Sequence, residues 1–259
     1  MRTIEVMGIA NVTPDSFYAS SRCQNESALA ERVGKMLDEG ADIIDIGACS
    51  TRPGSEPCGA EEEWDRLEWA IRLIHREFPE AKISIDSFRS DIVRRAFDVV
   101  GDFIANDVSA AADPDMLPTV ASLGLTYIST HTSREAHDNS PDIVGEVREF
   151  FRSFEQRAEE AGVRDWIADP GFGFGKSIDE NYELLAGLDR LGVKRRILIG
   201  VSRKSMIYKP FGLTPEDCLP QTQVLHLAAL QRGADILRVH DVAEAVRTVE
   251  TYRRLNNNL

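Results

Sequence analysis

Short runs of apolar residues, rich in isoleucine and valine, alternate along the chain with longer segments of mixed polarity. Short apolar runs of this kind are typical of strands that are buried on both faces of a parallel sheet. The pattern predicts strands at residues 4–10, 43–46, 83–86, 103–106, 126–130, 166–169, 197–200 and 236–239.

The longer segments carry apolar residues at helical spacing, and several of them end on a glycine just before the next strand. We expect Ser27 to cap the first of these helices, which closes on Gly40. The pattern predicts helices over residues 28–40, 60–78, 90–101, 142–162, 179–192, 221–233 and 241–255.

Eight strands in regular alternation with helices, within 259 residues, predict an α/β fold of the (β/α)8 or TIM-barrel type. The main alternative, a doubly wound open sheet, more often has fewer strands. Because no linker or low-complexity tract interrupts the chain, we expect one domain over residues 1–259.

Composition excludes some classes of partner. A net charge of −13 argues against nucleic-acid binding, although a local basic pocket for a small anion is compatible with it. No apolar run has the length of a signal peptide or a membrane span, so we expect neither. The four cysteines lack C-x-x-C spacing, which predicts free thiols in a reducing cytoplasm rather than a zinc knuckle or disulfides.

Polar residues cluster where the predicted strands end, and in a barrel of this type these ends share one mouth. They are Asn11, Asp45, Asp86, Asn106, His131, Asp169, Lys204, Arg238 and His240. Helix capping explains Asp107 and Asp241 equally well, and His75 and His226 fall within predicted helices. Asp45, inside an apolar strand, is also compatible with a purely structural carboxylate.

The polar residues form two chemical groups. Asp86, Asn106 and Asp169 suit a flat, nitrogen-rich heterocycle, because a carboxylate accepts two N–H bonds from an amidine-like edge. The second group offers donors to a phosphate or pyrophosphate and consists of Asn11, Arg52, Arg238 and His240. Lys204 fits either group. Together they predict a pocket for a heterocycle with a phosphorylated leaving group.

The stretch DPGFGFGKS, residues 169–177, superficially resembles a phosphate-binding P-loop. In a P-loop the first glycine lies five positions before the second, and here that position is Pro170, which has no N–H. The glycine spacing also fails the dinucleotide pattern. We therefore expect a flexible loop that presents Asp169 and Phe174, with Lys176 just beyond the site.

Seven motifs in order make the chain resemble the dihydropteroate synthase family of the folate pathway, over residues 7–241. They are MGIANVTPDSF, GADIIDIGACSTRPG, ISIDSF, NDVSA, DPGFGFGK, GVSRKS and RVHD. The resemblance implies a transferase that condenses 6-hydroxymethyl-7,8-dihydropterin diphosphate with 4-aminobenzoate to give 7,8-dihydropteroate and pyrophosphate. It further implies inhibition by sulfonamides.

The resemblance also assigns roles to residues. It implies pterin contacts at Asp86, Asn106, Asp169 and Lys204. It implies that the diphosphate is bound by Asn11, Arg52, Arg238 and His240, with Mg²⁺ at Asn11. It implies an aminobenzoate pocket lined by Thr51, Pro53, Phe174, Lys204 and Ser205. Catalysis is then expected from Asp169, Lys204, Arg52, Arg238 and His240, by diphosphate departure ahead of amine attack and without an enzyme nucleophile.

Family members are commonly homodimers, and apolar residues of the last two helices are candidates for that face. They are Val224, Leu227, Leu230, Val246 and Val249. A helix packed on its own barrel requires such a stripe as well.

The chain departs from the family pattern in three places. Residues 18–21 lack the acid that orders the first loop, where Ala19 stands instead, and residues 130–136 differ after the fifth predicted strand. The usual double glycine after the second strand is replaced by residues 47–49, Gly-Ala-Cys. Two other functions therefore stay open: a catalytically altered pterin-binding relative, and a corrinoid-dependent methyltransferase domain. The second needs no diphosphate site, so Arg52 and Lys204 argue against it.

Overall fold

The structure, a computed structural model, describes residues 2–13, 25–49, 58–132 and 141–256, and the statements below concern these residues. Eight parallel strands form one sheet in the order β6-β5-β4-β3-β2-β1-β8-β7. A bridge between Ala168 and Ile197 links β6 to the segment leading into β7, so the sheet closes into a barrel. The strands are β1 Glu5–Asn11, β2 Ile43–Gly47, β3 Ile83–Asp86, β4 Ile104–Asp107, β5 Thr126–Thr130, β6 Trp166–Asp169, β7 Leu198–Ile199 and β8 Ile236–Val239.

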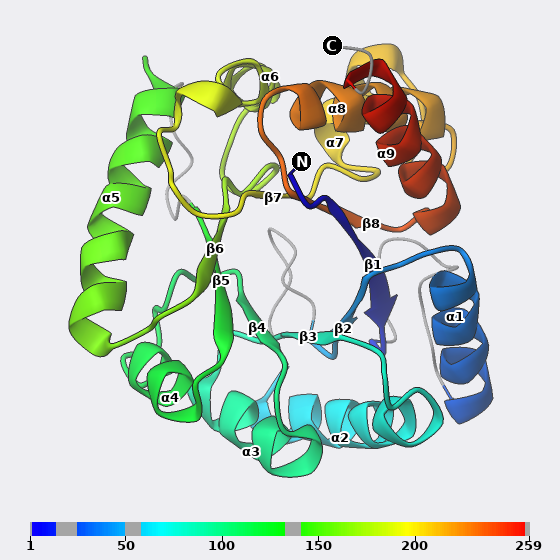
Figure 1. Cartoon of the computed structure of the whole chain (residues 1–259), viewed down its shortest axis with the longest axis vertical. Coiled ribbons are helices and arrows are strands. Elements are labelled where there is room, and N and C mark those ends of the chain that lie inside the picture. Colours follow the sequence, from blue (N-terminus) through cyan, green and yellow to red (C-terminus); the bar gives the residue numbers. More distant parts are fainter. Residues whose placement is uncertain (1, 14–24, 50–57, 133–140, 257–259) are drawn as a thin grey trace.

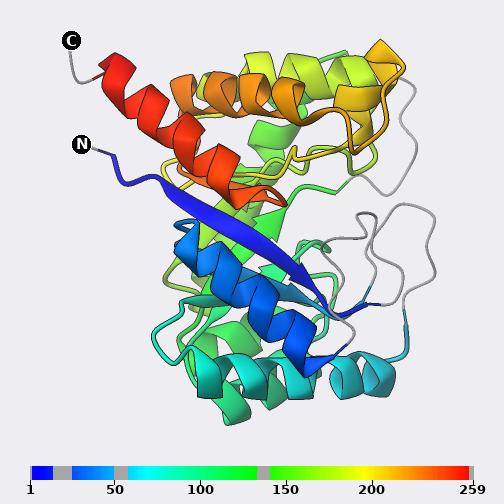
Figure 2. The ribbon, with the colours of Figure 1, turned by 90° about the vertical axis from the view of Figure 1, so that its right-hand side faces the viewer.

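Helices surround the strands as an outer ring (Figure 1). They are α1 Glu26–Asp38, α2 Ala60–Glu77, α3 Ser90–Val100, α4 Met116–Leu123, α5 Ile143–Ala161, α6 Ile178–Ala186, α7 Ser205–Tyr208, α8 Leu219–Gln231 and α9 Val242–Asn256. Figure 2 shows β1 lengthwise, with α1 on one side and α9 on the other. No helix within the described ranges is long and apolar enough to cross a membrane.

The TIM-barrel prediction is confirmed, and the strand predictions agree with the structure to within one or two residues. Two details were wrong: the side chain of Asn25, not Ser27, caps α1 by accepting the Ala28 N–H, and the helix predicted over residues 179–192 ends at Ala186 before a short 3₁₀ turn. Helix α4 was not predicted. It is short, and its first turn contains Pro118, which weakens a helical pattern in the sequence.

The interior of the barrel explains why polar residues reach the mouth. One layer of buried residues fills the lower interior: Met7, Ile43, Ile104, Ile128, Ile167, Leu198 and Ile236. Because strand side chains alternate between the two faces, the residue two positions further along each strand also points inward. These next positions include Asp45, Asn106, Asp169 and Arg238. The alternation of side chains that places apolar residues in the core therefore also places these polar residues inside the barrel, nearer its mouth.

His226 lies within α8 as expected, and its side chain is fully buried. Its Nδ1 lies 3.2 Å from Oε1 of Gln223. Burial lowers the pKa of His226 to about 4, so the imidazole is neutral in the folded protein near neutral pH.

This burial predicts a pH dependence of stability. The unfolded chain binds a proton at His226 near its usual pKa and the folded chain does not, so the contribution of His226 is present above that pKa and is lost as the pH falls toward 4. In His226→Gln, the loss of unfolding free energy between about pH 7 and about pH 5 should be smaller by about 2 kcal/mol. Denaturant titrations at both pH values measure this, and equal pH dependence in the two proteins would contradict it.

Candidate active site

A buried ion network spans the middle of the barrel. Nε of Arg238, on β8, donates to Oδ2 of Asp45 on β2 at 2.7 Å. Nη2 of Arg238 lies 2.5 Å from the same oxygen and 2.8 Å from Oδ2 of Asp86 on β3. Since Asp45 is fully buried and Asp86 nearly so, both carboxylates depend on this guanidinium for charge balance.

Asp45 extends the network to two further side chains. Its Oδ1 accepts a hydrogen bond from Ser84 Oγ at 2.6 Å and another from Asn106 Nδ2 at 3.2 Å. Asn106 is thereby held with its amide nitrogen on Asp45, which leaves the amide oxygen for another partner. Asp45 thus positions both Arg238 and Asn106.

Asp86 lies at the end of β3 with one oxygen engaged and the other free. Its Oδ1 is buried and has no hydrogen-bond partner among the described residues. Burial raises the pKa of Asp86 to about 7, and the nearby charge of Asp45 adds to this, whereas Arg238 opposes it. A buried carboxylate oxygen usually has a hydrogen-bond donor, so this oxygen is available to one.

Asn11 and Gly47 end β1 and β2 side by side in the sheet. A Cβ at Gly47 would lie 3.0 Å from Oδ1 of Asn11 and 3.6 Å from the Cβ of Asp86. Glycine at this position therefore keeps the Asn11 amide and the Asp86 carboxylate close to each other at the mouth.

The loop after β6 needs glycine at position 171 for two reasons. Gly171 has φ +71°, and a Cβ there would lie 1.9 Å from the backbone oxygen of His131. This close approach lets the Gly171 N–H donate to Oδ1 of Asp169 at 2.8 Å. The loop thereby fixes one oxygen of the Asp169 carboxylate.

Lys176 turns back into this loop rather than lying beyond the site. Its Nζ donates to three backbone oxygens, those of Gly171 at 2.9 Å, His131 at 3.1 Å and Phe174 at 3.3 Å. Burial lowers the pKa of Lys176 to about 7, and the charge of Asp169 opposes this. The lysine ties the loop to the end of β5.

Lys204 also contacts this loop. Its Nζ donates to the backbone oxygen of Phe172 and lies 4.6 Å from the centre of the Phe174 ring. Burial lowers the pKa of Lys204 to about 8, while the carboxylate of Asp169 favours the charged form. In turn, burial raises the pKa of Asp169 and Lys204 opposes that shift. A carboxylate, an ammonium group and an aromatic ring therefore meet at one place.

Lys204 is presented by a turn whose preceding residue, Arg203, is held by other groups. Arg203 has φ +56°, an uncommon conformation for a residue other than glycine. Its guanidinium forms two hydrogen bonds to Asp241, at 2.7 and 2.8 Å, and one to the backbone oxygen of Pro215 at 2.7 Å. The carboxylate of Asp241 is therefore paired with Arg203.

His240 sits beside this turn as a neutral imidazole. Its Nδ1 lies 3.1 Å from Oγ of Ser202, and that oxygen also accepts the His240 backbone N–H at 3.2 Å. Burial lowers the pKa of His240 to about 3, and the positive charge of Arg238 adds to this shift. His240 therefore offers hydrogen bonds rather than a charge.

Comparison with known proteins agrees with this geometry. The family model described as "Pterin binding enzyme" matches residues 7–240. The chain belongs to the pterin-binding enzyme family. A dihydropteroate synthase of Escherichia coli strain K12 is 37% identical over 257 residues, which cover 95% of this chain and 90% of that protein.

Solved structures of this pterin-binding family also match. A dihydropteroate synthase of Xanthomonas albilineans with 4-aminobenzoic acid is 37% identical, with a TM-score of 0.89 over 98% of this chain and 93% of that one. A dihydropteroate synthase of Yersinia pestis in a sulfonamide drug complex is 30% identical, with a TM-score of 0.93 over 98% and 95% of the two chains.

The structure brings most of the residues predicted for the site to this mouth of the pterin-binding barrel. They are Asn11, Asp86, Asn106, Asp169, Phe174, Lys204, Arg238 and His240. Ser205 begins α7 directly after Lys204. Thr51, Arg52 and Pro53 lie outside the described residues, as do positions 18–21 and 133–136. The specific roles of all these residues stay predictions.

Sequence reasoning missed the role of Asp45 as the organiser of the network and placed Lys176 beyond the site. Asp45 was considered as a structural carboxylate, and its hydrogen bonds agree with that view. Its isolated charge inside an apolar strand was the signal for a buried partner. The partners of Lys176 are backbone oxygens, which leave no trace in the sequence.

The close approach at Gly171 predicts a large effect of adding one methyl group. Gly171→Ala should weaken pterin binding by more than roughly tenfold, because the Cβ would push the loop away from His131 and release Asp169. Gly192→Ala is the matched control, since Gly192 has φ +66° and open space around a built Cβ. Calorimetric titration with a pterin measures the difference, and equal affinities in the two variants would refute the role of the loop.

Proposed function

We propose that this chain is a dihydropteroate synthase. It joins a pterin, activated as its 6-hydroxymethyl diphosphate, to 4-aminobenzoate and releases pyrophosphate. The observation that carries the proposal is the convergence of Asp86, Asn106, Asp169 and Lys204 on one barrel mouth in a chain that matches the pterin-binding family over residues 7–240. The curated relatives with this match are dihydropteroate synthases.

The pterin half of the proposed site is supported by unsatisfied and pre-oriented polar atoms. The buried Oδ1 of Asp86 has no protein partner among the described residues, and the Asn106 amide is fixed by Asp45. The second oxygen of Asp169 has only a long contact, 3.5 Å, from Thr130 Oγ1. Acceptors and an amide in this arrangement match the alternating N–H and carbonyl groups of a pterin edge.

The diphosphate half rests on donors that surround the end of β8. Nη1 of Arg238 is bonded to none of the described residues, because Asp45 and Asp86 engage Nε and Nη2. The neutral imidazole of His240 is a hydrogen-bonding group for the diphosphate, and the negative charge of that ligand would oppose the lowering of the His240 pKa by burial and Arg238. We propose Asn11 and Arg52 as further donors, as the family resemblance implies.

We propose Mg²⁺ as the cofactor, with Asn11 as its protein ligand. The fit is supported by Oδ1 of Asn11, a hard oxygen donor at the mouth next to the Gly47 position. Mg²⁺ usually keeps several waters and binds substrate phosphates, so one protein oxygen suffices. When bound, the ion neutralises the charge that develops on the departing diphosphate.

The aminobenzoate half of the site is supported by Lys204 and Phe174, whose ammonium and ring lie 4.6 Å apart. The ammonium suits a carboxylate or a ring oxygen, and the phenyl ring suits an aromatic face. We propose that Ser205, Thr51 and Pro53 complete this pocket.

The proposed chemistry needs no enzyme nucleophile. The C–O bond to the diphosphate breaks first, and the pterin ring delocalises the positive charge that forms on its methylene carbon. Asp169 stabilises this cation by its negative charge in a buried site, while Arg238 and Lys204 hold the anion and the ring. The amine of 4-aminobenzoate then forms the new C–N bond and loses a proton to water.

Two alternatives give different outcomes in one assay. A catalytically altered relative would bind pterin without turnover, and a corrinoid-dependent methyltransferase domain would not use the diphosphate. We expect the purified protein with Mg²⁺ to release pyrophosphate only when the pterin diphosphate and 4-aminobenzoate are both present, and a sulfonamide to compete with 4-aminobenzoate. No release with both substrates would contradict the proposal.

Lys204 provides a second test. Lys204→Ala removes the ammonium that contacts the loop after β6, so turnover should fall by roughly a hundredfold while the thermal unfolding transition is kept. Lys209→Ala, which removes an exposed lysine from the same region, is the matched control. If Lys204→Ala has the same kinetics as Lys209→Ala, Lys204 does not belong to the active site.

We further propose a homodimer in the cytoplasm. Of the apolar stripe predicted for the dimer face, Leu230 and Val249 instead pack in the chain's own core, whereas Val224 on α8 is 64% exposed. Leu255 on α9 is also exposed. Sedimentation analysis of Val224→Lys should show a shift toward monomer, and an unchanged mass would exclude α8 from the interface.

A further inference from the structure

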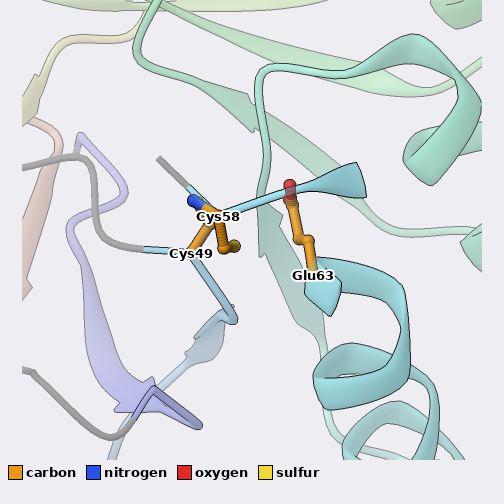
Figure 3. Close-up of side chains that lie close together, drawn as sticks. All are labelled: Cys49, Cys58 and Glu63. Atoms are coloured by element: carbon orange, nitrogen blue, oxygen red, sulfur yellow. The ribbon is translucent and has the colours of Figure 1, made fainter. Parts of the chain in front are cut away.

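Two cysteines and one glutamate lie close together beside the candidate active site (Figure 3). The sulfur atoms of Cys49 and Cys58 and a carboxylate oxygen of Glu63 all lie within 4.8 Å of one another. Cys49 follows the end of β2, Cys58 precedes α2, and Glu63 lies in the first turn of α2. The fold therefore brings together two thiols that the sequence separates by residues 50–57.

The carboxylate of Glu63 is only half satisfied. Glu63 is fully buried, and its Oε2 pairs with Nη1 of Arg89. Its Oε1 is buried and has no hydrogen-bond partner among the described residues. A buried carboxylate oxygen without a donor is rare and points to a missing cation or donor.

The donor set selects a particular class of metal. Thiolates favour soft or borderline ions, and two thiolates with one carboxylate match the ligand types of zinc. With metal–ligand bonds of about 2.0–2.3 Å, tetrahedral ligands lie about 3.3–3.8 Å apart. The three atoms therefore need only a small contraction from their present separation to share one ion.

We propose that Cys49, Cys58 and Glu63 form a zinc-binding site. Two thiolates and one carboxylate carry three negative charges, which Zn²⁺ and the guanidinium of Arg89 together balance. Arg89 also fixes the backbone at this site, since its Nη2 donates to the Cys58 carbonyl at 2.6 Å. The Cys58 N–H donates to the sulfur of Cys49 at 3.2 Å, which holds the two cysteines close together.

The site is separate from the proposed Mg²⁺ position at Asn11 and does not depend on the proposed function. Its place in the chain gives it a consequence, because Cys49 and Cys58 are the two ends of the segment that carries Thr51, Arg52 and Pro53. Zinc bound to both sulfurs joins these ends. A water molecule or a small ligand would occupy the fourth coordination position of the zinc ion.

The direct test is zinc titration of the reduced, metal-free protein by calorimetry, together with the ultraviolet absorption of the cadmium form. We expect one zinc per chain, a rise in the thermal unfolding temperature with zinc, and a thiolate-to-cadmium charge-transfer band. Cys49→Ser, Cys58→Ser and Glu63→Gln should each weaken zinc binding by at least roughly tenfold. Cys218→Ser, which removes a buried free thiol elsewhere, should bind zinc as the unaltered chain does.

Three results would overturn the proposal. They are no stoichiometric zinc binding by the reduced protein, undiminished binding by the Cys49→Ser/Cys58→Ser double variant, or a cadmium form without a charge-transfer band. The cadmium spectrum of the unaltered chain decides the matter even if a variant fails to fold.

Discussion

The guanidinium of Arg238, held between the carboxylates of Asp45 and Asp86, is the interaction on which the rest of the site depends. Charges buried inside a barrel are costly unless they are paired, so each member constrains the others. The network ties β8 to β2 and β3, and through Asp45 it also fixes the amide of Asn106 on β4. Four strands thus share one polar centre. Oδ1 of Asp86 and Nη1 of Arg238, which bond to none of the described residues, are the atoms that we assign to the substrates.

The loop after β6 supplies the other half of the site by a different physical device. Two partly buried lysines bind backbone oxygens there. Lys176 contacts Gly171 and Phe174 of the loop and His131 at the end of β5, and Lys204 contacts Phe172. Gly171 allows the loop to approach β5 more closely than any side chain would permit. These contacts hold the backbone of the loop that positions Asp169 and Phe174. Because burial lowers the pKa of both lysines, the site holds cations that lose protons easily, beside carboxylates that gain them easily.

The sequence predicts the barrel and the inward ring well, because both follow from local alternation along single strands. Features that arise between distant segments were missed or misjudged. The pairing of Asp45 with Arg238 joins residues of β2 and β8, and the contacts of Lys176 are made to backbone oxygens. Leu230 and Val249 belong to the chain's own core, although their spacing alone suited an interface. The cluster of Cys49, Cys58 and Glu63 escaped notice because the spacing of cysteines in the sequence does not show which of them lie close together in space.

The central claim is that Asp45, which is fully buried and contacts Arg238 and Asn106, positions the groups that act on the substrates. Steady-state kinetics of Asp45→Asn, beside the exposed control Asp38→Asn, test it most directly. The account predicts that kcat/KM for the pterin diphosphate falls by at least about a hundredfold in Asp45→Asn, equivalent to about 3 kcal/mol, while circular dichroism shows an intact fold. Kinetics of Asp45→Asn that match those of Asp38→Asn would contradict it.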